Sequence, residues 1–334
     1  MKLIRKILFP VVPFYYLVTW LRNICYDLGV KKSASYHFPV LCVGNLSVGG
    51  TGKTPMIEYL IKLLKDDFKV ATLSRGYKRK TKGFKLADGN ATAETIGDEP
   101  FQFYHKFGND VWVAVDSDRR NGIKNLRHLK DKPEIILLDD AFQHRRVKAG
   151  FNILLTTYAN PYYSDFVLPT GNLREPKSGA KRAHVVVVTK CPKHLKVSEK
   201  NSILNRIKAE SYQHVFFSSI VYSNEVFSKD ASKILETLTN FTLVTGIANA
   251  EPLVDFLNSK NLKFQHLNYN DHYQFSPQDI LYLEKQSLII TTEKDYMRLR
   301  QHGQLNGKLF YLPITIVLDR EHDFKKLIEQ AVKH

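Results

Sequence analysis

The feature that most constrains the fold is a glycine-rich turn with the sequence SVGGTGKT, residues 47–54. An apolar run at residues 40–45 precedes it, and helical spacing of apolar residues begins at Thr54. In this context glycines expose backbone N–H groups and the helix N-terminus attracts anions, so the pattern predicts a phosphate-binding loop (P-loop). The alternative is a glycine-rich turn with a chance lysine. The expected nucleotide-binding residues are Ser47, Val48, Gly49, Gly50, Thr51, Gly52, Lys53 and Thr54.

Length and composition indicate the number of domains, the redox compartment and the charge of the binding partners. With 334 residues, 43% of them hydrophobic, the chain is long enough for two domains. The three cysteines form no C-x-x-C pair, which indicates a reducing compartment and argues against a disulfide framework or a zinc site. The net charge of +16 predicts anionic partners: nucleic acid, a phosphorylated substrate or an acidic membrane surface.

The N-terminus contains an apolar run at residues 7–21, with basic residues on both sides. The run is shorter than the ~20 residues of a spanning helix, and two prolines interrupt it. No small-residue cleavage site follows, which argues against a signal peptide. We therefore expect a helix in the membrane interface, with its aromatic side chains at headgroup depth. The alternative is a helix packed on the protein's own core.

Short apolar runs predict a mostly parallel sheet covered on both faces. They lie at residues 40–45, 70–74, 111–115, 134–140, 151–156 and 184–189. Ligands bind at the carboxyl ends of such strands, which favours the basic turn 75–80 as an anion contact. A solvated run of charges is the alternative for that turn. Arg119 or Arg120, in the turn after residues 111–115, could clamp a phosphate.

The run at 134–140 ends in Asp139 and Asp140. A strand-end acid holds Mg²⁺ opposite the loop threonine in P-loop enzymes, so this pair strengthens the prediction of a nucleotide site. Gln143 and His144 follow and would lie beside the phosphates. Thr189-Lys190 begins like a GTPase base-reading signature but lacks its aspartate.

Hydrophobic density falls between residues 222 and 240, and a second α/β pattern follows. We expect an α/β protein with a P-loop NTPase-like, mostly parallel sheet and a smaller α/β domain. The expected domains are an N-terminal membrane-associated helix at 1–30, a P-loop core at 31–221, a linker at 222–240 and the smaller domain at 241–334.

Several ordered motifs together resemble the tetraacyldisaccharide 4'-kinase family of lipid A biosynthesis. They are SVGGTGKTP at 47–55, GDEP at 97–100, LDDAFQH at 138–144, LPTGNLREP at 168–176, DHY at 271–273 and TEKD at 292–295. The resemblance runs from the apolar N-terminus to the last quarter of the chain.

The resemblance implies an activity. Members use ATP and Mg²⁺ to phosphorylate the 4'-hydroxyl of a tetraacylated glucosamine disaccharide 1-phosphate, which gives the lipid A precursor lipid IVA. The work is done at the cytoplasmic face of the inner membrane, so the N-terminus becomes a monotopic anchor. The implied partners are the glycolipid and an anionic membrane surface, with no nucleic acid and no obligate protein partner.

It also implies roles for individual residues. Asp98 matches a general base and His272 its partner. Lys53, Arg119 and Arg120 fall where phosphate charge is neutralised. The metal set is Thr54, Glu99, Asp139 and Asp140. The substrate set is Arg75, Tyr77, Gln143, His144, Asn172 and Arg174. From the residues alone, acids at the start of a helix such as Asp98 and Glu99 could equally be N-terminal capping groups.

Two departures from the family pattern matter. Ala141 stands where the family usually has glycine, beside the metal acids. Asp98 and His272 belong to different expected domains, so they meet only if the domains close on each other.

Two other function classes remain open at this point. A P-loop regulator or GTPase-like switch fits the basic charge, but the incomplete Thr189-Lys190 signature and the apolar N-terminus count against it. A kinase or ligase acting on a small soluble metabolite shares the nucleotide site but leaves the N-terminus unexplained.

Overall fold

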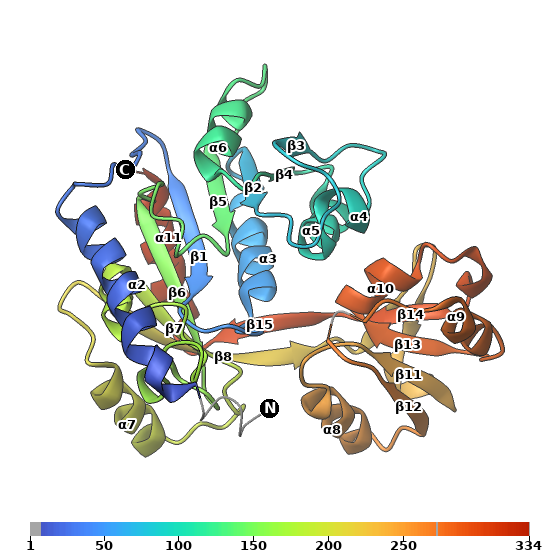
Figure 1. The fold of residues 1–334 in the computed structure, drawn as a ribbon. Coiled ribbons are helices and arrows are strands. Elements are labelled where there is room, and N and C mark those ends of the chain that lie inside the picture. Colours follow the sequence, from blue (N-terminus) through green and yellow to red (C-terminus); the bar gives the residue numbers. More distant parts are fainter. Residues whose placement is uncertain (1–7, 272, 334) are drawn as a thin grey trace.

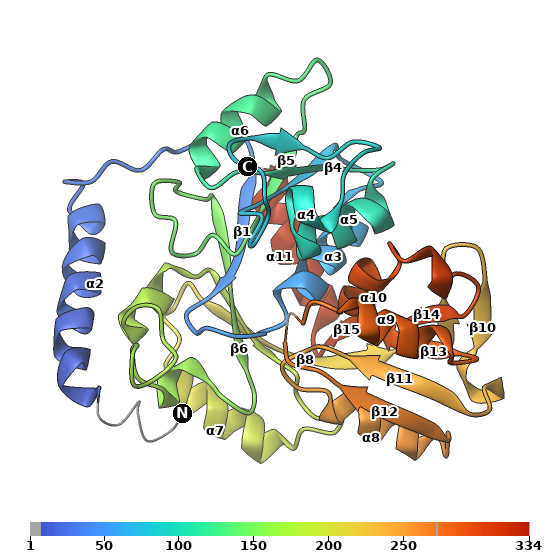
Figure 2. The ribbon, with the colours of Figure 1, turned by 45° about the vertical axis from the view of Figure 1, so that its right-hand side comes forward.

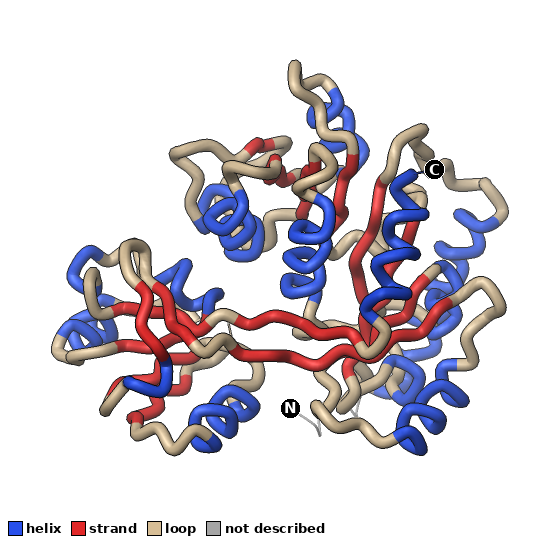
Figure 3. Tube along the Cα trace, turned by 180° about the vertical axis from the view of Figure 1, so that it is seen from behind, coloured by secondary structure: helices blue, strands red, loops and turns tan. Residues whose placement is uncertain are grey.

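The computed structural model describes residues 8–271 and 273–333, which form two sheets joined by a pair of long strands (Figures 1 and 3). The strands are β1 Val40–Asn45, β2 Val70–Ser74, β3 Lys85–Leu86, β4 Trp112–Val115, β5 Ile135–Asp139, β6 Phe151–Thr157, β7 Val185–Thr189, β8 His214–Tyr222, β9 Glu225–Phe227, β10 Ser232–Ile234, β11 Phe241–Thr245, β12 Phe264–Asn268, β13 Ile289–Thr292, β14 Leu309–Leu312 and β15 Ile314–Leu318. The α-helices are α2 Val12–Asp27, α3 Lys53–Leu64, α4 Ala93–Ile96, α5 Asp98–Phe107, α6 Arg119–Arg127, α7 Val197–Ile207, α8 Glu251–Ser259, α9 Pro277–Glu284, α10 Glu293–Leu299 and α11 Glu321–Lys333. Short 3-10 helices lie at Phe9–Val11, Tyr162–Ser164, Lys177–Arg182, Leu235–Thr237 and Gly303–Leu305.

The larger sheet has the strand order β15-β8-β7-β6-β1-β5-β2-β4-β3. Strands β8 to β4 in this order run parallel, while β15 and β3 are antiparallel at the edges. Every residue of β1, β2, β5 and β7 is buried, as expected for strands covered on both faces. The predicted α/β class with a mostly parallel sheet is confirmed.

Separate apolar cores lie on the two faces of this sheet. One contains the apolar stripe of α3, from Met56 to Leu64, together with Phe103 of α5 and Phe324 of α11. The other contains Ile123 and Leu126 of α6 and residues from α7 and the loops after β6. In Figure 2 the P-loop leaves β1 near the middle of the sheet, at its carboxyl edge.

The smaller sheet has the order β10-β9-β14-β13-β11-β12 and belongs to an insertion between β8 and β15. Figure 3 shows β8 and β15 running from one sheet to the other. We call residues 223–313 the small unit and the rest of the described chain from β1 onward the large unit.

This arrangement differs from the predicted boundaries. Residues 222–240, expected as a linker, include β9 and β10, which pair in the small sheet. Residues 314–333, expected in the C-terminal domain, return to the large unit, where Phe324, Ile328 and Val332 of α11 are buried beside α3. The sequence does not predict that α11 packs in the large unit, because an apolar stripe indicates a helix but not the core against which the helix packs.

Helix α2 lies along the outside of the large unit (Figures 1 and 2). Val12 and Tyr15 pack partly against the core, but Phe14 and Val18 are 72% and 65% exposed. Asn23 is the buried residue of the helix. The alternative of a helix buried in the protein's own core is therefore wrong for most of its apolar side chains. Within the described residues, no helix is long and apolar enough to cross a bilayer.

Candidate active site

A cavity of about 1260 Å³ lies between the large unit, the small unit and α2. Its lining includes the loop after β1, the ends of β2 and β5, and Ile247, Asn249 and Lys294 of the small unit. The volume exceeds the ~300–1000 Å³ of a typical small-ligand pocket, so there is room for a nucleotide and a second substrate. The P-loop and the predicted metal acids meet in this cavity.

The P-loop has the backbone geometry that an anion site requires. Gly49 and Gly52 have φ values of +105° and +89°, a region that side chains with a Cβ rarely adopt. Gly52 is the N-cap of α3, so the helix N-terminus faces the cavity. The Thr189 hydroxyl donates to the Thr51 carbonyl at 2.8 Å, which ties the loop to the end of β7.

Asp140 lies between two cations. Its carboxylate is 3.7 Å from Lys53 Nζ and 3.0 Å from Arg174 Nη1. Burial opposes ionisation of this carboxyl, but Lys53 and Arg174 outweigh it and hold its pKa below the usual value. Asp140 therefore balances the charge of Lys53, the lysine of the P-loop.

The pKa of Asp139 is shifted in the opposite direction from that of Asp140. It is 6% exposed, and burial, Glu99 and Asp140 raise its pKa to about 7. Oδ2 accepts from the Ser74 hydroxyl at 3.1 Å, whereas Oδ1 is buried without a hydrogen-bond partner. A buried, unpartnered carboxylate oxygen beside a second acid fits the demands of a divalent cation.

No cluster of three or more histidine, cysteine or acidic side chains able to hold a metal occurs among residues 8–271 and 273–333. P-loop magnesium sites need fewer protein ligands, because nucleotide phosphates and water complete the shell. Thr54, Glu99 and Asp139 all line the cavity and suit such a site.

Arg119 is 2% exposed, and burial lowers its pKa. Its guanidinium donates to the Asp116 and Asp139 carbonyls at 3.0 and 3.1 Å, and Nε has no partner. The side chain therefore joins the ends of β4 and β5 and lines the cavity beneath the acids.

Gln143 and His144 also line the cavity. Gln143 donates to the Asn45 carbonyl at 2.8 Å and to Glu175 at 2.9 Å, which links the loop after β5 to the end of β1. Burial and the nearby Arg119 lower the pKa of His144 to about 4, so the imidazole is neutral at pH 7.

The segment 168–176 reaches the site through backbone pairing with the start of the P-loop. Val48 N–H donates to the Asn172 carbonyl at 2.8 Å, and Arg174 N–H donates to the Leu46 carbonyl at 2.7 Å. Arg174 consequently lines the cavity, whereas the Asn172 side chain bonds to Asp165 at 2.9 Å outside it. The other predicted substrate residues, Arg75 and Tyr77, are exposed at the cavity edge.

Asp98 lies at the first turn of α5, next to Glu99. Its carboxylate pairs with Arg298 of the small unit, and Asp98 itself is outside the cavity lining given by the described residues. His272, its predicted partner, lies outside the described residues, so the pairing of these two residues stays a prediction.

The sequence did not predict the roles of two lysines, Lys190 at the P-loop and Lys106 between the two units. Lys190, in left-handed conformation after β7, approaches Gly50 of the P-loop and has a pKa lowered by burial. Lys106 lies between Glu58 and Glu293, at 2.5 Å from each, and so connects the P-loop helix with the small unit. The Thr189-Lys190 dipeptide could have indicated Lys190. No local pattern predicts the contact of Lys106 with Glu293, because these residues are far apart in sequence.

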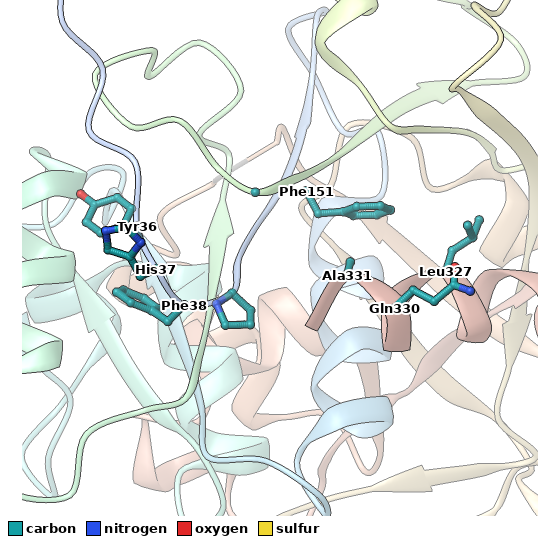
Figure 4. A pocket seen from close by; sticks show the side chains of 9 residues that line it. Tyr36, His37, Phe38, Phe151, Leu327, Gln330 and Ala331 are labelled. Atoms are coloured by element: carbon teal, nitrogen blue, oxygen red, sulfur yellow. The ribbon is translucent and has the colours of Figure 1, made fainter. Parts of the chain in front are cut away.

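A second cavity, of about 530 Å³, lies at the opposite end of the strands (Figure 4). Its lining includes Tyr36, Phe38 and Phe151, before and at the starts of β1 and β6, and Leu327 and Ala331 of α11. It contains neither the P-loop nor the strand-end acids, so its chemistry does not fit phosphate transfer.

The comparisons with known proteins agree with this geometry. A sequence model of the family described as tetraacyldisaccharide-1-P 4'-kinase matches residues 4–333. A tetraacyldisaccharide 4'-kinase from Flavobacterium johnsoniae is 50% identical over 339 residues, covering 100% of this chain and 98% of that protein. One from Bacteroides fragilis is 44% identical, covering 96% and 91%.

Among solved structures, LpxK from Aquifex aeolicus in complex with ATP superposes with a TM-score of 0.79. It is 31% identical and covers 98% of this chain and 99% of its own.

Proposed function

The chain belongs to the tetraacyldisaccharide-1-P 4'-kinase family, and on that premise we propose that it transfers the γ-phosphoryl group of ATP to the 4'-hydroxyl of a tetraacylated glucosamine disaccharide 1-phosphate. The sugar oxygen attacks the γ-phosphorus, the bond to the β–γ bridging oxygen breaks, and ADP leaves with that electron pair. The observation that carries the proposal is the meeting of Lys53, Asp139 and Asp140 in a cavity that α2 also lines.

The P-loop holds the nucleotide phosphates through its backbone N–H groups and the N-terminus of α3. Lys53 is released from Asp140 toward the β- and γ-phosphates when ATP binds, and Arg119 and Arg174 add positive charge nearby. Thr54, Glu99 and Asp139 would hold Mg²⁺, with Asp140 beside them. The ion would neutralise charge on the transferring group.

Asp98 receives the proton of the sugar hydroxyl, with His272 as the partner that orients it and shares the proton. A carboxylate with an ordinary pKa of about 4 is a weak base toward an alcohol, so a partner of this kind is needed. The place of Asp98 at the start of α5, next to Glu99 at the cavity, supports this role.

Helix α2 anchors the enzyme at the cytoplasmic face of the inner membrane. Its apolar side chains Phe14 and Val18 point to solvent, while Tyr15, Thr19 and Arg22 line the cavity. The exposed face of α2 thus suits acyl chains and headgroups, and its cavity face suits a sugar. This arrangement allows a membrane-embedded substrate to reach ATP in the cavity. Polar contacts hold the helix in place: Asn23 Nδ2 donates to Glu175 at 2.7 Å, and Tyr15 donates to the Arg174 carbonyl at 2.9 Å.

Label transfer tests the activity. Detergent-solubilised protein is incubated with Mg²⁺, ATP labelled on the γ-phosphate, and the disaccharide 1-phosphate. We expect label in a glycolipid with wild-type protein and none with Lys53→Met. Label that appears only as free phosphate would favour a regulator or a kinase of another substrate.

Vesicle binding tests the anchor separately. Phe14→Ser combined with Val18→Ser removes exposed apolar area without touching Asn23 or the cavity. Binding to anionic vesicles at high salt, where surface electrostatics are screened, should be lost. Leu281→Ser, at a leucine of α9 in the small unit that is 59% exposed, is the control and should bind as wild type does. Undiminished binding of the double variant would contradict the anchor.

A further inference from the structure

Arg298 of α10 joins the two units at the start of α5. Its Nε donates to Asp98 Oδ2 at 3.0 Å, and Nη2 donates to the same oxygen. On the other side, Nη1 donates to Asp295 Oδ1 at 3.2 Å. The side chains of Arg298 and Asp98 are 11% and 21% exposed, so this bridge is partly shielded from solvent and salt.

Asp295 makes the bridge rigid. It is 0% exposed, and its Oδ2 accepts from the Gly246 N–H at 2.8 Å and from the Thr292 hydroxyl at 2.7 Å. The Arg298 side chain is therefore held by a carboxylate that is itself fixed to the ends of β11 and β13.

We propose that Arg298 is a positioning residue for phosphoryl transfer: acting from the small unit, it holds one oxygen of Asp98 and so sets the orientation of the carboxylate that receives the sugar proton. This inference rests on the proposed function, because it requires Asp98 to be that proton acceptor. A planar guanidinium suits the task, since its donors have fixed directions. The contact of α10 with α5 thus contributes to the site.

The contact between the two units does not depend on Arg298 alone. The contact between α5 and α10 has a second, independent charged link, in which Lys106 bridges Glu58 and Glu293 at 2.5 Å. It also includes Arg300, whose guanidinium lies 5.9 Å from the Phe101 ring. Loss of Arg298 therefore leaves docking contacts in place and removes its two hydrogen bonds to Asp98.

The test compares Arg298→Met, Arg298→Lys and the control Arg300→Met, all in the full chain. We expect Arg298→Met to lower kcat about tenfold or more with KM for ATP nearly unchanged, because a misplaced catalytic group costs up to about 100-fold. Arg298→Lys keeps the charge but loses the fork, so it should recover part of the loss. Within the described part of the chain, Arg300, the residue directly after α10, has no hydrogen bond or ion pair to Asp98, so Arg300→Met removes a nearby cation and should keep wild-type kcat.

A double-mutant cycle separates positioning from docking. If Arg298 acts through Asp98, adding Arg298→Met to Asp98→Ala lowers kcat no further. Additive losses, or a wild-type kcat in Arg298→Met, would overturn the inference while leaving the activity of the wild-type enzyme intact. A wild-type enzyme inactive on the glycolipid would instead overturn the proposed function and this inference with it. Should Arg298→Met not fold, the Arg298→Lys variant decides: unchanged kcat would contradict the proposal.

Discussion

Replacement of Gly44 in β1 by alanine should displace the turn that follows β5 and so distort the candidate active site. Gly44 is in β1, three residues before the P-loop, and packs against the turn that follows Asp139 and Asp140. A Cβ at this position would lie 2.6 Å from the Phe142 Cβ and 3.1 Å from its backbone nitrogen. Carbon atoms in contact prefer about 3.5–4.0 Å, so the turn must move outward by about 1 Å.

That displacement has two expected consequences. Overpacking a buried site costs typically about 1–3 kcal/mol, which urea unfolding would detect. The turn directly follows Asp140, which pairs with Lys53, and a shift of about 1 Å in such a group can cost about 100-fold in rate. We therefore expect Gly44→Ala to fold with reduced stability and to lose most of its kinase activity.

The matched control is Gly150→Ala, just before β6. The nearest atom to its added Cβ is the Val40 carbonyl at 3.8 Å, an ordinary contact. This variant should keep its activity and its stability to within about 1 kcal/mol. Wild-type stability and activity in Gly44→Ala would refute the claim that close approach of the backbone places the acids.

Three further predictions follow from burial and charge. Asp139→Asn replaces a carboxylate oxygen by an amide nitrogen and keeps the shape of the side chain, so the Mg²⁺ concentration for half-maximal activity should rise by about 10- to 100-fold; an unchanged Mg²⁺ titration would argue against a metal role. Phe324→Ala should destabilise the large unit by about 3–5 kcal/mol in urea unfolding, because this fully buried ring packs edge-on against the core, whereas Leu281→Ala at an exposed site should have little effect. The pKa values of His105 and His144 are lowered to about 4, mainly by burial, so folding keeps both neutral, and stability should fall as pH drops from about 6.5 toward 4; melting temperatures that stay constant over this range would contradict it.

Much of the large unit is predictable because its signals are local. The strand over residues 70–74 has the expected bounds, and α3 begins at Lys53, one residue before the expected start. A buried parallel strand is a continuous apolar run, and the P-loop fixes its own flanking strand and helix. The register of β1 against β5 then brings Asp140 to the loop, with its N–H donating to the Val43 carbonyl at 3.0 Å.

The rest depends on contacts between distant residues. The return of α11 to the large unit, the Lys106 bridge and the pairing of Arg298 with Asp98 join segments that lie far apart in the chain. A single sequence contains the side chains for these contacts but no periodicity that pairs them. For the same reason, the Asn172 side chain was predicted for the substrate but bonds to Asp165, a partner that no motif specifies.

The position of the transferred phosphate tests the account most directly. Purified full-length enzyme, Mg²⁺, ATP and the tetraacylated disaccharide 1-phosphate are incubated, and the product is analysed by mass spectrometry and NMR. We predict one added phosphate on the 4'-oxygen, formed by wild type and absent with Lys53→Met. Phosphate on another oxygen, or product formed equally well by Lys53→Met, would contradict the assignment of this cavity as the site of 4'-phosphorylation.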